Sequence, residues 1–390
     1  MIELDGKNAS ITPDGGALET PKKTLFQENW ILFRKNRLAM AGLVIFVAFF
    51  IIAVAGVLLT RGRDPLFDPA LVRLQEKLRP PLSKPNLETL KPEEMPRLGI
   101  YLFGTDDLGR DVFSRMFQGS WVSLTVGFVA VGIAVVIGVF LGGIAGYYGD
   151  KKIQLGHLLC PILLGVGIAG LASGKIGMGL FLLLLGIGVA AVLKLMGNHT
   201  KQQPVPVGLS FLFLNLFSVD VLITGLIDIM LCFPSFFLIL TVVALLPTNI
   251  YYIMAVIGLT SWMGSARFVR AEFLSLREQD FVTAAQALGV RDLRIIFRHM
   301  VPNGVAPVLV SATIGIATAI LTEAGLSFLG FGDPSYATWG NILSDGKDFI
   351  FDAPWLTFIP GFAILIVVLA FNLFGEGLRE VLNPKLRERH

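Results

Sequence analysis

Long, uninterrupted apolar stretches dominate the chain, and each has about the length of a membrane-spanning helix. A helix needs about 20 mostly apolar residues to cross the hydrocarbon core of a bilayer. The stretches are continuous rather than alternating, which favours helices over the strands of a β-barrel. They cover residues 38–59, 122–148, 153–172, 176–196, part of 208–246, 250–266, 305–329 and 355–374. The pattern predicts an all-α fold, a polytopic membrane helical bundle with about eight transmembrane helices.

The stretch 208–246 is too long for one straight span. As a helix it would extend about 58 Å, roughly twice the thickness of the hydrocarbon core. It therefore holds two spans, or one span preceded by a segment at the membrane surface. Basic residues favour the cytoplasmic side, and they cluster before the first stretch, in 265–303 and near the C-terminus. An even number of crossings must separate the first two clusters, which predicts one span starting near Val219, with 208–218 at the cytoplasmic interface.

Composition agrees with a membrane protein. Hydrophobic residues make up 54% of the chain and charged residues only 16%, whereas about a quarter of an ordinary soluble protein is charged. The net charge of +3 is too small to imply a nucleic-acid partner. The two cysteines, Cys160 and Cys232, lie in apolar stretches, and the four histidines are scattered. No disulfide framework and no metal-ligand spacing follows from them, so we expect neither a metal nor a cofactor.

Two glycine-rich motifs resemble nucleotide-binding loops, but the residues around them do not fit a nucleotide site. Residues 165–170 fit GxGxxG but sit inside an apolar helix, without the preceding strand that a dinucleotide site requires. Residues 170–175 are one residue short of a phosphate loop, and Ile176 stands where Ser or Thr is needed. We therefore expect no enzyme activity in this chain. If transport uses ATP, another chain supplies the ATPase.

The polar stretch 265–303 contains the most informative segment, a short amphipathic helix that ends at Gly289. Its apolar residues recur at i, i+3, i+4 and i+7 and so share one face. They are Phe281, Ala284, Ala285 and Leu288. Glycine at position 289 can end the helix in a left-handed conformation. The apolar face can dock in a groove of a partner protein or rest on lipid, and these residues alone leave both open.

This segment resembles the EAA loop of binding-protein-dependent ABC transporter permeases. The family pattern is Glu-Ala-Ala, three residues, a glycine and later Leu-Pro. Here it reads Thr283-Ala284-Ala285, then Gly289, then Val301-Pro302, with departures at Thr283 and Val301. The resemblance implies a coupling helix that sits in a cleft of an ATPase subunit. Its expected interface residues are Phe281, Thr283, Ala284, Ala285, Leu288 and Gly289.

Further segments are similar to the C-type permease subunit of the dipeptide/oligopeptide branch. The resemblance spans residues 30–149 and 219–386. The matching segments are 30–39, 103–115, 277–281, 294–303, 326–330, 339–340, 353–356 and 371–379. In the family a Gly-Tyr-Tyr-Gly turn leads directly to Val-Asp, but here residues 150–218 separate Gly149 from Val219. The resemblance therefore implies a six-helix permease core with an inserted helical hairpin.

Four parts follow from this organisation. Residues 1–38 form a cytoplasmic N-terminal segment, and 39–149 hold two transmembrane helices joined by a long extracytoplasmic loop. Residues 150–218 hold the inserted hairpin and an interfacial segment. Residues 219–390 complete the permease core, with the cytoplasmic coupling loop at 265–303.

The resemblance implies a permease subunit of an ATP-driven importer for peptides, forming half of the translocation pathway. It implies a second homologous permease, two ATP-binding subunits and an extracytoplasmic solute-binding protein as partners. The chain would lie in lipid in the bacterial plasma (inner) membrane, with both termini in the cytoplasm. Alternatives are a permease for another solute, such as a nickel chelate or glutathione, or a secondary transporter. The last would use ionisable residues at membrane depth, for which Asp228 and Glu323 are candidates, although both also suit helix packing.

Overall fold

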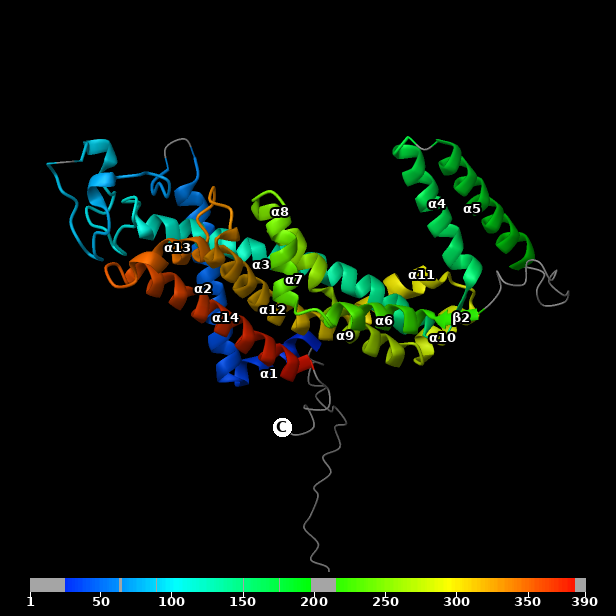
Figure 1. Cartoon of the computed structure of the whole chain (residues 1–390). Coiled ribbons are helices and arrows are strands. Elements are labelled where there is room, and N and C mark those ends of the chain that lie inside the picture. Colours follow the sequence, from blue (N-terminus) through cyan, green and yellow to red (C-terminus); the bar gives the residue numbers. More distant parts are fainter. Residues whose placement is uncertain are drawn as a thin grey trace, which may run out of the picture.

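The computed structural model describes residues 25–382, except 63–64, 89, 150, 175 and 198–214. The described part is mostly helical, apart from the long loop before α3 (Figure 1). Its helices are α1 (Leu25–Lys35), α2 (Arg37–Thr60), α3 (Val112–Tyr148), α4 (Leu155–Ala172), α5 (Ile176–Gly197), α6 (Val219–Leu231), α7 (Ser235–Leu245), α8 (Ile250–Thr260), α9 (Trp262–Leu276), α10 (Asp280–Ala287), α11 (Asp292–Arg294), α12 (Val301–Leu326), α13 (Trp339–Gly346) and α14 (Trp355–Leu382). Two short strands, β1 (Lys152–Gln154) and β2 (Asn215–Ser218), pair antiparallel.

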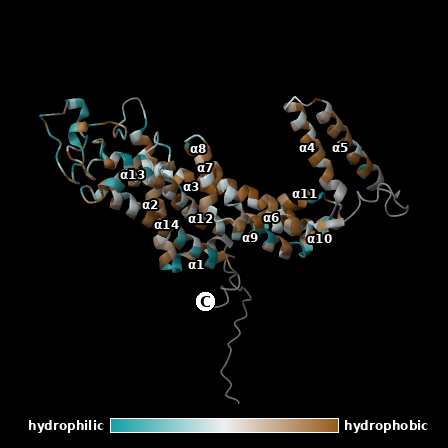
Figure 2. Ribbon diagram, in the orientation of Figure 1, coloured by the Kyte–Doolittle hydropathy of each residue, from teal (hydrophilic) through white to brown (hydrophobic). Residues whose placement is uncertain are grey.

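Six described helical segments are long and apolar enough to cross a membrane. They are Arg37–Thr60, Val112–Tyr148, Ile176–Lys194, Ile250–Leu276, Asp292–Phe331 and Trp355–Leu382. The pair α6–α7 adds a seventh, bent segment, and the apolar part of α4, Leu159–Ala172, is shorter. Hydrophilic residues gather in the loop before α3 and around α1 and α10, with apolar helices between them (Figure 2). The prediction of an all-α polytopic membrane protein is confirmed.

The predicted span after Val219 begins where expected, but it is not straight. Helix α6 begins at Val219, and α6 and α7 are bent by 79° at the break between them. Pro234 lies in this break, and proline lacks the N–H that a continuous helix needs. The pair nevertheless connects the two ends of the bundle. Its start is bonded to the end of α3, while α8, which follows it, begins against Val122 in the first half of α3.

Other boundaries also differ from the hydropathy pattern. Helix α3 begins at Val112 rather than at 122, because the side chain of Asp111 caps it by accepting bonds from the backbone N–H groups of Phe113 and Ser114. The stretch predicted to end at 266 continues as helix to Leu276. Charged residues enter helices readily, so the loss of hydropathy after 266 marks a change of surroundings rather than the end of the helix.

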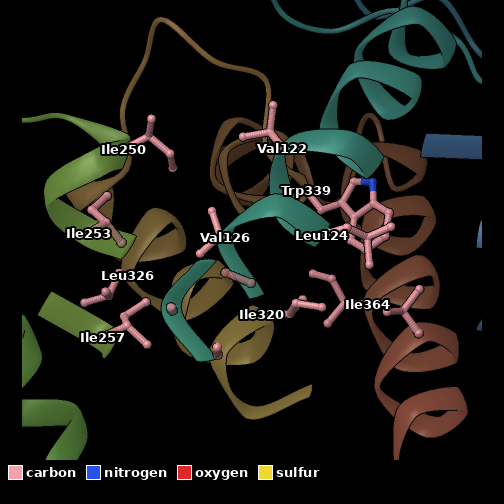
Figure 3. Packing of buried hydrophobic residues seen from close by; sticks show 14 of the residues in the cluster. Val122, Leu124, Val126, Ile250, Ile253, Ile257, Ile320, Leu326, Trp339 and Ile364 are labelled. Atoms are coloured by element: carbon pink, nitrogen blue, oxygen red, sulfur yellow. The ribbon is translucent and has the colours of Figure 1, made fainter. Parts of the chain in front are cut away.

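Helix α3 is the central element of the bundle. It packs against α2, α8, α9 and α12, and its buried side chains meet those of four other helices (Figure 3). In this core, side chains of α3, α8, α12, α13 and α14 converge; they include Val122, Leu124, Val126, Ile250, Ile253, Ile257, Ile320, Leu326, Trp339 and Ile364. The indole N–H of Trp339 donates a 3.3 Å hydrogen bond to the carbonyl of Met116, which fixes α13 to α3.

Glycines set the close approach of α3 to α9. A Cβ added at Gly138 would lie 2.6 Å from the Cβ of Ser265, and one at Gly142 would collide with the carbonyl of Ala266. A Cβ added at Gly146 would likewise collide with the side chain of Phe273. The three glycines recur every four residues, a small-xxx-small spacing that is typical of closely packed membrane helices.

The segment between α3 and α6 leaves the bundle and returns to the same point. Lys152 of β1 pairs with Ser218 of β2, the N–H of Val219 bonds to the carbonyl of Lys151 at 3.1 Å, and the N–H of Asp220 bonds to that of Gly149 at 3.2 Å. Helices α4 and α5 pack mainly on each other and project away from the bundle (Figure 1). The region is therefore an excursion whose two ends lie side by side.

Candidate coupling site

Helix α10 rests on the bundle through one narrow face. Val282 is fully buried and Ala285 is 7% exposed. Both belong to a cluster with Phe273 of α9 and with Ile295 and Ile296, which lie in the π-helical turn Ile295–Met300 before α12. Positions three apart lie on one side of a helix, so this pair forms the seat of α10.

The opposite side of α10 is open. Phe281 is 39% exposed and Leu288 is 83% exposed, and Ala284 between them is exposed as well. Thr283 is also exposed, and its hydroxyl donates to the carbonyl of Asp280 at 3.0 Å. A small residue at position 284, flanked by two large apolar side chains, leaves a shallow apolar surface.

The expectation that Ala285 shares this open face is wrong. Its side chain faces the bundle, because α10 must cover part of the cluster beneath it and Ala285 stands one turn from Val282. The apolar repeat predicts a face but does not say which of its edges lies against the protein. We therefore define the outer face of α10 by Phe281, Ala284 and Leu288.

Gly289 ends α10 as the sequence predicts. Its φ of +71° lies in the left-handed region, and its N–H donates to the carbonyl of Gln286 at 2.9 Å. The N–H of Val290 bonds to the carbonyl of Ala285 at 3.1 Å, which closes the turn. The space around Gly289 is open, so the backbone conformation is what requires glycine here.

Tyr147 ties this region to the end of α3. Its hydroxyl donates to Oδ1 of Asp292 at 3.0 Å and accepts a bond from Nε2 of Gln286 at 3.4 Å. The sequence treats Tyr147 only as part of the Gly-Tyr-Tyr-Gly turn, so this role is a finding of the structure. The sequence signal that could have revealed it is a tyrosine at the end of an apolar span, just before the helix breaks at Gly149.

Two ion pairs join α6 to α9 near the same end. Arg270 pairs with both carboxylate oxygens of Asp220, and Nη2 of Arg267 lies 2.7 Å from Oδ1 of Asp228. The second intramembrane acid, Glu323, is fully buried in α12 and accepts a 2.7 Å bond from the hydroxyl of Ser327. Asp228 thus has a partner on a neighbouring helix, whereas Oε2 of Glu323 has no hydrogen-bond partner among the described residues.

A second charged cluster lies at the opposite end of the bundle, within residues 103–115 and α13. Oδ2 of Asp106 accepts from Arg110 and Arg115, both at 2.6 Å, and Asp345 accepts from the same two arginines at 3.0 and 2.8 Å. Burial raises the pKa of neighbouring Asp107, and the charges of Asp106 and Asp345 add to the rise. Asp106, Asp107 and Asp345 are close enough to hold a cation. Two guanidinium groups already neutralise Asp106 and Asp345, so the cluster is an ion-pair network joining the loop to α13.

These features define a class, a multi-pass helical membrane protein. Comparison with known families identifies it as a component of a transport system. A family model described as "Binding-protein-dependent transport system inner membrane component" matches residues 205–388. A second, described as "N-terminal TM domain of oligopeptide transport permease C", matches residues 24–81.

Individual relatives align with nearly the whole chain. The dipeptide transport system permease protein DppC of Alkalihalophilus pseudofirmus is 33% identical over 363 residues, covering 93% of this chain and 90% of that protein. DppC of Haemophilus influenzae is 32% identical over 367 residues, covering 94% and 97%. The oligopeptide transport system permease protein OppC of Bacillus subtilis is 29% identical over 389 residues, covering 100% and 98%. The chain belongs to the family of binding-protein-dependent ABC transporter permeases of the dipeptide/oligopeptide type. It is a membrane subunit of a transporter and not an enzyme.

Proposed function

We propose that the chain is the permease subunit of an ATP-driven importer of peptides and forms half of its translocation pathway. The observation that carries the proposal is the similarity to dipeptide and oligopeptide permeases over almost the full length of the chain. The outer face of α10 supports it, since an exposed apolar surface on a seated helix suits a partner's groove. The partners are a second homologous permease, two ATP-binding subunits and an extracytoplasmic solute-binding protein.

Coupling runs through the seat of α10. An ATPase subunit that grips the outer face moves α10, and the buried contacts of Val282 and Ala285 carry this movement to α9 and α12. The hydrogen bonds of Tyr147 carry it to the end of α3. Because α3 is the central helix, a shift at this end reaches the rest of the bundle and switches it between inward- and outward-facing states.

We assign α10 and both chain termini to the cytoplasm. Arg291, Arg294 and Arg298 are exposed beside α10, and basic residues favour the cytoplasmic side. Counting α6–α7 as one bent span gives six crossings before α10, which keeps the N-terminus on the same side. In a variant without Cys160 and Cys232, an impermeant thiol reagent applied to intact cells should label cysteine placed at Lys84 or Lys347. Cysteine at Arg291 should stay unlabelled, and labelling there would overturn this orientation.

Reconstitution tests the function itself. The chain should co-purify with ATP-binding subunits, and the complex in proteoliposomes should take up a labelled dipeptide only with ATP and the binding protein present. Uptake driven by an ion gradient without ATP would instead identify a secondary transporter. Uptake of a nickel chelate but of no peptide would keep the ABC permease and reject the substrate class.

A further inference from the structure

The loop before α3 contains a cavity of about 350 Å³, at the opposite end of the bundle from α10. Three segments line it: residues 65–73, residues 93–102 and the start of α3. Its apolar lining includes Leu66, Phe67, Leu71, Leu98, Ile100 and Phe113. Ligand sites typically measure about 300–1,000 Å³, so this cavity suits a very small molecule or the end of a chain.

Arg73 brings a buried positive charge to the wall of this cavity. The residue is 5% exposed, its Nε donates to the carbonyl of Glu94 at 2.5 Å, and its guanidinium lies 5.9 Å from the ring centre of Tyr101. Nη1 has no hydrogen-bond partner, and no ion pair involves Arg73 among the residues described. Buried arginines are almost always paired with an anion, and within the described residues Arg73 has no ion-pair partner.

One carboxylate of the lining is already engaged by other donors. Asp111 also lines the cavity, but its oxygens accept from the N–H groups of Phe113 and Ser114 and from the Ser114 hydroxyl at 2.5 Å. Arg73 lowers the pKa of Asp111, yet burial outweighs this and raises it overall. The cap of α3 therefore uses Asp111, and the charge of Arg73 remains available to a ligand.

Charges of both signs surround the cavity. Arg97 and Glu93 are exposed at its edge, and the carboxylate-bearing residues Asp68 and Glu94 also line it. No ion pair joins these four side chains to one another within the described part of the loop. Separate positive and negative groups around an apolar wall match a small zwitterion, whose two charges each need an opposite partner.

We propose that this cavity binds a short zwitterionic peptide, with its C-terminal carboxylate at Arg73 and its ammonium group toward Glu93 and Glu94. The proposal rests on the proposed function and names a substrate subsite outside the bundle. By our orientation the cavity lies on the extracytoplasmic side, where peptide leaves the binding protein. A transient hold on the carboxylate there would raise the local concentration of peptide at the entrance.

Binding of alanyl-phenylalanine and of its C-terminal amide tests the site. Both are titrated into the complete transporter in nanodiscs, without the binding protein. The free acid should bind about 10- to 100-fold more tightly than the amide, as expected for a charge-assisted hydrogen bond to a carboxylate. Arg73→Met should abolish this preference. Arg79→Met is the matched control, because Arg79 pairs with Glu76 at 2.9 Å and does not line the cavity.

A second variant tests the site even if Arg73→Met misfolds the loop. Leu98 is 49% exposed at the cavity, so Leu98→Glu should fold normally and repel the carboxylate, again lowering the preference. Equal affinity of acid and amide for the wild type overturns the proposal, as does an unchanged preference in both variants. Arg73→Met can also leave peptide affinity unchanged and instead weaken docking of the binding protein. In that case Arg73 pairs with a carboxylate of the binding protein, and the proposed peptide site is wrong. ATP-driven uptake by the same complex that shows no carboxylate preference would reject the cavity alone and leave the proposed function standing.

Discussion

The hydroxyl of Tyr147 donates a 3.0 Å hydrogen bond to Oδ1 of Asp292, joining the last turn of α3 to the segment that follows α10. The two residues are 145 positions apart in the chain. Gln286 of α10 donates to the same hydroxyl at 3.4 Å, so one phenol group connects a central span to both sides of the turn at Gly289.

Removing this hydroxyl should loosen the coupling of ATP hydrolysis to transport. Tyr147→Phe keeps the ring in its cluster but deletes both bonds, at a cost of about 0.5–1.5 kcal/mol each. We expect assembly and ATPase activity to persist while peptide uptake per ATP hydrolysed falls. Tyr252→Phe, which removes a hydroxyl from an exposed position on α8, should change neither quantity. Normal uptake per ATP in Tyr147→Phe would show that this link carries no force.

Two adjacent alanines of α10 should respond differently to enlargement. Ala284→Trp adds bulk on the outer face, so the permease should keep its thermal stability while ATPase attachment weakens by roughly 10- to 100-fold. Ala285→Trp forces bulk into the seat and should lower the melting temperature as well, since overpacking costs about 1–3 kcal/mol or more. Pull-down and thermal unfolding of both variants separate these effects.

The control for these variants is Ser275→Trp, at an exposed position on α9 outside the outer face of α10. It should leave ATPase attachment unchanged. If Ala284→Trp also retains the ATPase subunits at full affinity, the outer face is not the docking surface.

Gly289 should resist any side chain, because the strain lies in the backbone. Gly289→Ala places a Cβ at φ +71°, which costs about 1–2 kcal/mol although the surroundings are open. We expect α10 to lose its ordered end and uptake to fall. Gly225→Ala, in open space within α6 at an ordinary helical φ, should be neutral or slightly stabilising. Equal uptake by the two variants would argue against a coupling role for this turn.

The excursion between α3 and α6 should be dispensable for transport. Gly149 and Val219 can be joined directly, because the backbone at Gly149 already bonds to Asp220 at 3.2 Å. Helices α4 and α5 pack mainly on each other, so removing them should leave the bundle intact. We expect the shortened protein to assemble and to transport peptide in proteoliposomes. An assembled complex without transport would make the hairpin an integral part of the pathway.

The chain's own pattern determined the class of fold. A helix that crosses lipid needs about 20 apolar residues, so hydropathy locates α2, α4 and α5 closely. Local sequence also determined the left-handed cap at Gly289, because this turn depends on only a few neighbouring residues. The family resemblance lies in short sequence motifs, which can be identified without the structure.

Tertiary structure decided what those elements touch. An apolar repeat gives α10 a face, but only the cluster beneath it buries Ala285 and leaves Ala284 free. Hydropathy also cannot show that Arg267 and Arg270 pair with acids on α6, or that Gly149 and Val219 end side by side. The residues in these pairs lie dozens of positions apart in the sequence. They arise from how the helices pack against one another, which no local pattern of residues encodes by itself.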